Sequence, residues 1–204
     1  MAVPGRSRAV SHARRRLQRD PVLAKVIKMV PAGVEIRPSR NRYRSLVEAI
    51  ITQQLSGHSA GAISKRFRAM YGAPYPRPAD VLGTPDSRLR ETGLSVRKAE
   101  CIKKISGMIE SGRIRLDRAG RMSDDEITKM LTQVKGVGRW TAEIFLMFGL
   151  GRMDVLPAGD LGLRKGVMLF YGLPDMPSED DVRRIAEGWR PYRTVATWYI
   201  WKAQ

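Results

Sequence analysis

LTQVKGVGRWTA, residues 131–142, is the stretch of this sequence that decides its predicted fold. It places a compact turn, Lys135-Gly136-Val137-Gly138, between two segments with helical character. The two glycines leave the backbone uncovered where the second helix begins, so its free amides can face a phosphate. The pattern predicts two helices joined by a hairpin, over about residues 124–149, that binds a DNA backbone. An ordinary tight turn between helices is the alternative interpretation.

An acidic residue, Asp160, follows the hairpin at the end of the loop LPAGD, residues 156–160. Apolar residues with helical spacing begin directly after it, so Asp160 is also well placed to cap a helix that starts at Leu161. A carboxylate that follows a DNA-binding hairpin indicates chemistry on the bound strand. Capping and catalysis are compatible, and both interpretations stay open. Asp154, earlier in the same loop, is the weaker candidate acid.

The charge of the chain favours a nucleic-acid partner. It has 37 lysines and arginines against 20 aspartates and glutamates, a formal net charge of +17. Such an excess binds a polyanion through counterion release. Residues 1–20 hold six arginines and one aspartate, which contributes +5 and leaves +12 for the rest. We expect residues 1–20 to be a basic arm that is mobile without DNA. Generic solubilising charge is the alternative.

The composition excludes several classes of protein. Cys101 is the only cysteine, which excludes an intrachain disulfide framework and an iron–sulfur cluster with four cysteine ligands. It lies in an amphipathic pattern and is expected to be a small buried hydrophobe. No apolar run approaches about 18 residues, and the arginine-rich start lacks an apolar centre, so neither a membrane span nor a secretory signal is predicted. We expect an intracellular monomer, cytoplasmic and nucleoid-associated in a prokaryote or nuclear in a eukaryote.

Helical periodicity dominates the remaining sequence, and strand-like alternation is scarce. Asp20 before Pro21, Ser123 with Glu126, and Ser178 with Asp181 are typical of helix starts. Further helices are predicted over about residues 21–29, 43–54, 58–71, 78–82, 85–92 and 192–201. The sequence therefore predicts an all-α array of about ten short helices.

Four motifs resemble those of the helix–hairpin–helix (HhH-GPD) superfamily of DNA glycosylases. In chain order they are IITQQLS (50–56), GLSVRK (93–98), the hairpin stretch with LPAGD, and WRPYR (189–193) with Trp201. The resemblance covers roughly residues 21–204 and is strongest to the alkylbase branch, which is 3-methyladenine DNA glycosylase II-like. It implies an all-α fold of two helical lobes, with the active-site cleft between them and no iron–sulfur cluster.

The resemblance also implies a reaction on damaged double-stranded DNA in base-excision repair. Members of this branch rotate a nucleotide out of the duplex, hydrolyse the bond to its alkylated base, and leave an abasic site. The implied bases are of the 3-methyladenine and 7-methylguanine type, which are cationic and leave without protonation. Bifunctional members have a lysine where Trp140 stands, and its amine forms a Schiff base that leads to strand cleavage. A monofunctional glycosylase without lyase activity is therefore implied, with no cofactor required.

The implied site has a catalytic carboxylate, Asp160, that stabilises the oxocarbenium-like sugar and orients water. Its implied base pocket is aromatic and consists of Trp140, Trp201 and Tyr43. The residues implied as a wedge, which fill the gap left by the flipped nucleotide, are Gln54, Leu55 and Leu94. The implied contacts to the DNA backbone are Gly136, Gly138, Arg139, Thr141 and Lys98. Backbone carbonyls of Thr132, Val134 and Val137 match those that hold a monovalent cation, Na⁺ or K⁺, when DNA is bound.

Two other hypotheses come from different functional classes. The first is a non-catalytic DNA-binding or damage-recognition protein that keeps the hairpin and the wedge, and the presence of Asp160 argues against it. The second is a basic RNA-binding protein whose resemblance is limited to the hairpin. Competition between duplex DNA and RNA distinguishes this second hypothesis from the glycosylase.

Overall fold

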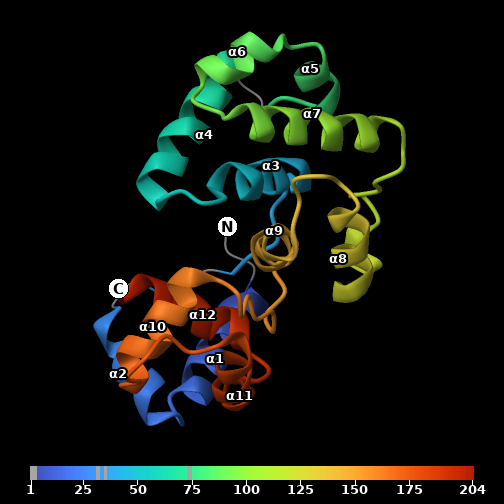
Figure 1. The fold of residues 1–204 in the computed structure, drawn as a ribbon. Helices are drawn as coiled ribbons and strands as arrows, with labels where there is room; N and C mark the ends of the chain where they lie inside the picture. Colours follow the sequence, from blue (N-terminus) through green and yellow to red (C-terminus); the bar gives the residue numbers. More distant parts are fainter. Residues whose placement is uncertain (1–3, 31–32, 35, 73–74) are drawn as a thin grey trace. The chain divides into compact units, whose positions relative to one another are not determined.

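The computed structural model describes residues 4–30, 33–34, 36–72 and 75–204. All regular elements in this part of the chain are helical, which confirms the predicted all-α class (Figure 1). The chain forms two compact units. Unit 1 comprises Met1–Pro38 and Gly151–Gln204, and unit 2 is the continuous segment Ser39–Leu150.

Unit 2 is built around a long helix, α7. Its α-helices are α3 (Arg42–Thr52), α4 (Gly57–Tyr71), α5 (Pro78–Leu82), α6 (Asp86–Glu91), α7 (Val96–Glu110), α8 (Asp124–Thr132) and α9 (Arg139–Ile144). A 3₁₀ turn (Ala119–Arg121) precedes α8, and a π-helical turn (Phe145–Gly149) continues α9. Helix α7 packs against α3, α5 and α6 (Figure 1). Fully buried apolar side chains from these and neighbouring helices form the core: Leu46, Ile50, Phe67, Leu89 and Ile102.

Unit 1 combines the two ends of the chain. Its α-helices are α1 (Pro4–Leu17), α2 (Pro21–Met29), α10 (Leu161–Tyr171), α11 (Glu179–Ala186) and α12 (Arg193–Lys202), with a 3₁₀ turn at Glu187–Trp189. Helix α12 packs against α10, α2 and α1 (Figure 1). Trp189 Nε1 donates to the Tyr171 hydroxyl at 3.0 Å, and that hydroxyl donates to Asp20 Oδ2 at 2.7 Å. Asp20 Oδ1 caps α2 as predicted, so one chain of hydrogen bonds joins both segments of unit 1.

The chain enters and leaves unit 2 at neighbouring positions. The Ser39 amide donates to the Gly149 carbonyl at 3.1 Å. Immediately beyond, Gly151 has a left-handed φ of +68°, and a Cβ atom there would lie 2.7 Å from the backbone nitrogen of Pro38. Only glycine fits both the conformation and this close approach.

The two predicted capping boxes are confirmed. Ser123 Oγ accepts the Glu126 amide at 3.2 Å, and Glu126 Oε2 accepts the Ser123 amide at 2.7 Å. This second bond holds the pKa of Glu126 below its usual value. Ser178 and Asp181 form the same reciprocal pair at the start of α11. Both helices therefore begin where a local sequence pattern says they should.

Residues 1–20, which the sequence predicts to be a basic arm, contain the helix α1. Ala13 and Leu17, four residues apart, are 0% and 1% exposed, and α1 packs against α12 and α2. The arginine-rich composition hides these two apolar positions, so the sequence did not predict the helix. Residues 1–3 lie outside the described residues. The mobility of residues 1–20 without DNA stays a prediction.

Candidate functional site

The hairpin between α8 and α9 is closed by its own backbone. The Val137 amide donates to the Val134 carbonyl at 2.9 Å. Both valine side chains are buried, at 4% and 1% exposure, whereas Lys135 between them is exposed. The apolar side chains anchor the turn, and its backbone and its lysine remain accessible.

Gly136 gives the hairpin its shape and brings it close to α7. Its φ of +99° is left-handed, and a Cβ atom there would lie 3.0 Å from Cys101 Sγ. Cys101 is 4% exposed, and burial raises the pKa of its thiol to about 11. The prediction that Cys101 is a small buried hydrophobe is confirmed, and its side chain packs beneath the backbone of the hairpin at Gly136. A side chain at Gly136 would be strained and would press on the sulfur.

Helix α9 begins with an open backbone. Gly138 is its N-cap, and a Cβ atom there would have no heavy atom within 4 Å. The first amides of a helix have no partner within the helix, and they favour an anion. Arg139 is 75% exposed and pairs with Glu143 at 2.9 Å. The next residue, Trp140, is half-buried. This end of α9 can therefore receive a phosphate.

A short loop joins α3 to α4, and we call residues 53–56 the wedge loop. Among the described residues, Gln54 is the single non-glycine with a positive φ, which is +54°. This conformation costs on the order of 1 kcal/mol for a residue with a Cβ atom. Gln54 is exposed, and Leu55 is 37% exposed. Backbone strain at the exposed Gln54, next to a second exposed side chain, is typical of a functional loop.

Hydrogen bonds connect the wedge loop to the hairpin and to α7. Gln53 Nε2 donates to the Gly136 carbonyl at 2.9 Å and to Thr141 Oγ1 at 2.7 Å. Lys98 Nζ donates to the carbonyls of Ile51 and Gln53, both at 2.7 Å. The Lys98 bonds satisfy backbone carbonyls at the C-terminal end of α3, which have no partner within the helix. Partial burial lowers the pKa of Lys98.

In unit 1, Asp160 is the N-cap of α10. Its Oδ1 accepts the Leu163 amide at 2.6 Å and Trp201 Nε1 at 2.8 Å. Both Asp160 and Trp201 are half-buried. The predicted cap is therefore confirmed, and the indole of α12 fixes the carboxylate from a second side.

Two glycines of α10 allow α12 to come this close. A Cβ atom at Gly162 would lie 3.1 Å from Asp160 Oδ1 and 3.4 Å from atoms of the Trp201 indole. A Cβ atom at Gly166, one turn later, would overlap Ile200 and lie 2.7 Å from Gln204 Nε2. Small residues four positions apart make a groove on α10 that receives α12.

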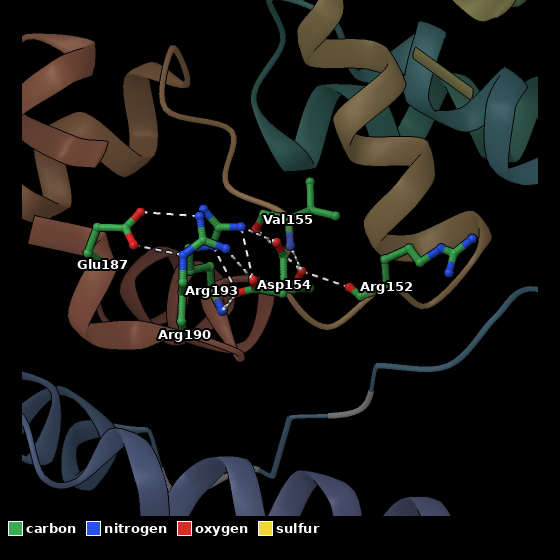
Figure 2. Close-up of polar contacts among 7 residues, drawn as sticks. Arg152, Asp154, Val155, Glu187, Arg190 and Arg193 are labelled. Carbon is green, nitrogen blue, oxygen red and sulfur yellow. Dashed lines mark hydrogen bonds and ion pairs between the residues drawn. The ribbon is translucent and has the colours of Figure 1, made fainter. Parts of the chain in front are cut away.

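Asp154, the rival acid, has a structural role. Figure 2 shows Arg190 and Arg193 directed toward its carboxylate. Arg193 Nε lies 2.8 Å from Oδ1, and Arg190 Nη1 lies 2.9 Å from Oδ2. Arg190 also pairs with Glu187, which lowers the pKa of that glutamate. Two guanidinium groups neutralise Asp154 and connect its loop to the start of α12.

Neither a protein-bound metal centre nor a membrane helix is found in residues 4–30, 33–34, 36–72 and 75–204. Within these ranges no group of three or more His, Cys, Asp or Glu side chains could hold a metal ion. No helix there has the length and apolar character needed to cross a bilayer.

Comparison with protein families identifies the fold. The family described as HhH-GPD superfamily base excision DNA repair protein matches residues 47–191. The chain belongs to the HhH-GPD superfamily. This match includes the wedge loop, the hairpin and Asp160.

Similar HhH-GPD proteins are named as glycosylases. DNA-3-methyladenine glycosylase 1 of Schizosaccharomyces pombe is 38% identical, over 81% of this chain and 76% of that protein. The putative DNA-3-methyladenine glycosylase YfjP of Bacillus subtilis is 32% identical, over 84% of this chain and 62% of that protein. A solved structure of the Schizosaccharomyces pombe 3-methyladenine DNA glycosylase in complex with abasic DNA has a TM-score of 0.85 and 35% identity, covering 94% of this chain and 95% of that one.

Four of the predicted site residues have contacts within unit 2 that are separate from DNA, and their roles at DNA stay predictions. Lys98 completes α3, as described above, because its ammonium is drawn to the carbonyl end of that helix. Thr141 is 2% exposed, and its hydroxyl accepts from Gln53. Leu94 is 4% exposed and directly precedes Ser95, the N-cap of α7. Tyr43 is 7% exposed, and its hydroxyl lies 2.6 Å from Ser106 Oγ in the core of unit 2.

The functional roles of the other predicted residues likewise stay predictions. Unit 2 exposes Gly138, Arg139 and Gln54, and unit 1 brings Asp160 and Trp201 together. Sequence reasoning missed the Gly162 and Gly166 groove, although their four-residue spacing was a signal. It also missed the contact of Gln53, because nothing local indicates a partner more than eighty residues away.

Proposed function

We propose that the protein is a monofunctional DNA glycosylase that removes alkylated bases of the 3-methyladenine and 7-methylguanine type from duplex DNA. The observation that carries this proposal is the position of Asp160, which is held by the Leu163 amide and the Trp201 indole in an HhH-GPD chain. The names of its relatives support the class of substrate.

Asp160 would act at the sugar. When a cationic base leaves with the bonding electron pair, it becomes neutral and positive charge grows on the sugar. A carboxylate nearby stabilises this oxocarbenium-like state and accepts a proton from the attacking water. The water oxygen then bonds to the sugar carbon, and an abasic site remains. The two hydrogen bonds to Oδ1 fix the orientation of the carboxylate before DNA arrives.

Trp140 and Trp201 would bind the base. A cationic purine is attracted to the face of an aromatic ring by about 0.5 to 2 kcal/mol. Trp140 also occupies the position where bifunctional relatives carry their lysine. No amine is available there for a Schiff base, so water is the nucleophile and strand cleavage does not follow.

The DNA backbone would be held by the hairpin. The open amides near Gly138 and the exposed Arg139 face a phosphate, and Gln54 with Leu55 fills the gap in the stack. A monovalent cation would bind the carbonyls of Thr132, Val134 and Val137. The Val134 carbonyl already accepts one hydrogen bond, but a carbonyl has two lone pairs, so the turn fits this role.

Base release is the measurement that tests the proposal. The protein is incubated with duplex DNA that contains 3-methyladenine or 7-methylguanine, and both released base and strand breaks are measured. We expect released base, with breaks only after alkali. Binding without release would instead favour a non-catalytic damage-recognition protein, and breaks without alkali would contradict monofunctional hydrolysis. Preferred binding to duplex RNA would favour the RNA-binding hypothesis.

A further inference from the structure

We propose that Gln53 is a positioning residue that couples the DNA-binding hairpin to the wedge loop. This inference rests on the proposed function and extends it to a residue that does not itself touch DNA. Gln53 bridges two parts of the hairpin, because Nε2 donates to the Gly136 carbonyl at 2.9 Å and to Thr141 Oγ1 at 2.7 Å. A carbonyl only accepts, so the amide nitrogen must face the hairpin.

Gln53 also controls the backbone of the wedge residue. Its carbonyl belongs to the peptide group that leads into Gln54, and Lys98 Nζ donates to that carbonyl at 2.7 Å. The side chain of Gln53 is fixed by the hairpin, and its main chain is fixed by α7. The peptide group before Gln54 is therefore held from two sides, which accounts for the persistence of the left-handed φ of +54°.

The coupling would fix the distance between the bound phosphate and the wedge. The Gly136 carbonyl lies in the same turn whose amides would face a phosphate. A wedge that enters the base stack must do so at a fixed distance from that phosphate. With the Gln53 bridge in place, binding of the backbone also places Gln54, and less conformational freedom is lost during base flipping.

Four variants separate this role from a purely structural one. Gln53→Ala removes the bridge, and Gln53→Glu keeps the shape but lacks the NH₂ donors. Thr141→Val removes one acceptor of the bridge, and Thr141→Ser keeps it as the conservative rescue. Gln18→Ala is the matched control. This glutamine is also half-buried, but it lies in the connection between α1 and α2 of unit 1 and not in the wedge loop.

The readouts are DNA affinity, base flipping and base release. Flipping is followed by the fluorescence of 2-aminopurine placed beside the lesion, and release is measured in a single turnover. For a paired 7-methylguanine, we expect Gln53→Ala and Gln53→Glu to slow flipping and release about tenfold, the effect of losing one or two hydrogen bonds. Affinity for undamaged duplex should change less than about twofold, since the phosphate contacts remain.

A lesion opposite an abasic site gives the sharpest comparison, because less pairing must be broken before the base leaves the stack. We expect the defect of the Gln53 variants to shrink to about twofold on this substrate. Thr141→Ser should resemble the unchanged protein, Thr141→Val should be slow, and Gln53→Ala with Thr141→Val should be less than additive.

Equal defects on paired and unpaired lesions would overturn the proposal, as would flipping at the unchanged rate. If Gln53→Ala fails to fold, the Thr141→Val and Thr141→Ser pair decides the question in its place. Absence of base release by the unchanged protein would be a failure of the proposed function. The fluorescence comparison between variants would then still test the coupling by itself.

Discussion

The hairpin region of unit 2 and the Asp160 region of unit 1 hold their proposed functional atoms by different means. In unit 2 the proposed functional groups are main-chain amides of the hairpin and the wedge loop, and their shape is held by Gln53 of that loop and by Lys98 and Cys101 of α7. In unit 1 the proposed functional group is one carboxylate, that of Asp160, which is fixed by the first turn of its own helix and by one indole. An exposed backbone keeps its conformation through contacts with other segments of the chain, whereas a capping carboxylate is held mostly by the helix that it caps. Substitutions in unit 1 should therefore change the rate of base release, and substitutions in the hairpin should change stability and DNA affinity.

The largest effect should come from Asp160→Asn. Asparagine is as good an N-cap as aspartate, so α10 should remain intact. The charge that stabilises the sugar is lost, and we expect base release to fall about a thousandfold at unchanged DNA affinity. Single-turnover release and a binding isotherm measure the two quantities. The exposed Asp175→Asn is the matched control, and residual activity near that of the control would contradict the assigned role.

The next effect should distinguish the two glycines of the hairpin. Gly136→Ala places a methyl group in a left-handed conformation against Cys101, and we expect a loss of about 1 to 2 kcal/mol in the free energy of unfolding. Gly138→Ala meets open space and should lose only about 0.5 kcal/mol. Chemical denaturation measures both changes.

Both glycine variants should nevertheless bind DNA about tenfold more weakly, because each obstructs the approach of a phosphate to open amides. Salt titration of binding checks this expectation. Equal stability of the two variants would show that contact with Cys101 does not constrain the hairpin.

A smaller effect is expected for Trp201→Phe. Phenylalanine keeps most of the ring but cannot donate to Asp160, so the carboxylate loses the hydrogen bond from the indole. We expect release to slow about tenfold while affinity for undamaged DNA is unchanged. Trp198→Phe, on the same helix and half-buried, is the control. A change in affinity alone would mean that the indole serves binding and does not orient the acid.

The smallest effect should be the pH dependence contributed by Cys101. Burial raises the pKa of its thiol to about 11, whereas the unfolded thiol keeps a value near 9.0. The neutral thiol favours the folded state, so this contribution is complete below the unfolded value and is lost as the pH rises toward the folded one. We expect the free energy of unfolding to fall more steeply over this range than in Cys101→Ala. Parallel slopes in the two proteins would contradict the burial effect.

Local patterns in the sequence predicted the helix starts and the hairpin correctly. Asp20, Ser123 and Asp160 cap the helices that follow them, because a cap depends only on residues within one turn. A sequence motif does not show which way a side chain points, and Lys98 and Leu94 illustrate this. The first completes a distant helix and the second is buried, and both outcomes depend on tertiary packing.

The hydrogen bond between Ser39 and Gly149 has a consequence for how the chain folds. Unit 2 is one uninterrupted segment, and its formation brings its two ends together. The two segments of unit 1 are far apart in sequence, and folded unit 2 is the closed loop that brings them together. The entropy cost of closing this loop is then already met by the folding of unit 2. Unit 2 should thus fold first and template the unit that carries the acid. During synthesis, unit 1 can assemble only after all of unit 2 has emerged, because the second segment of unit 1 follows unit 2 in the chain.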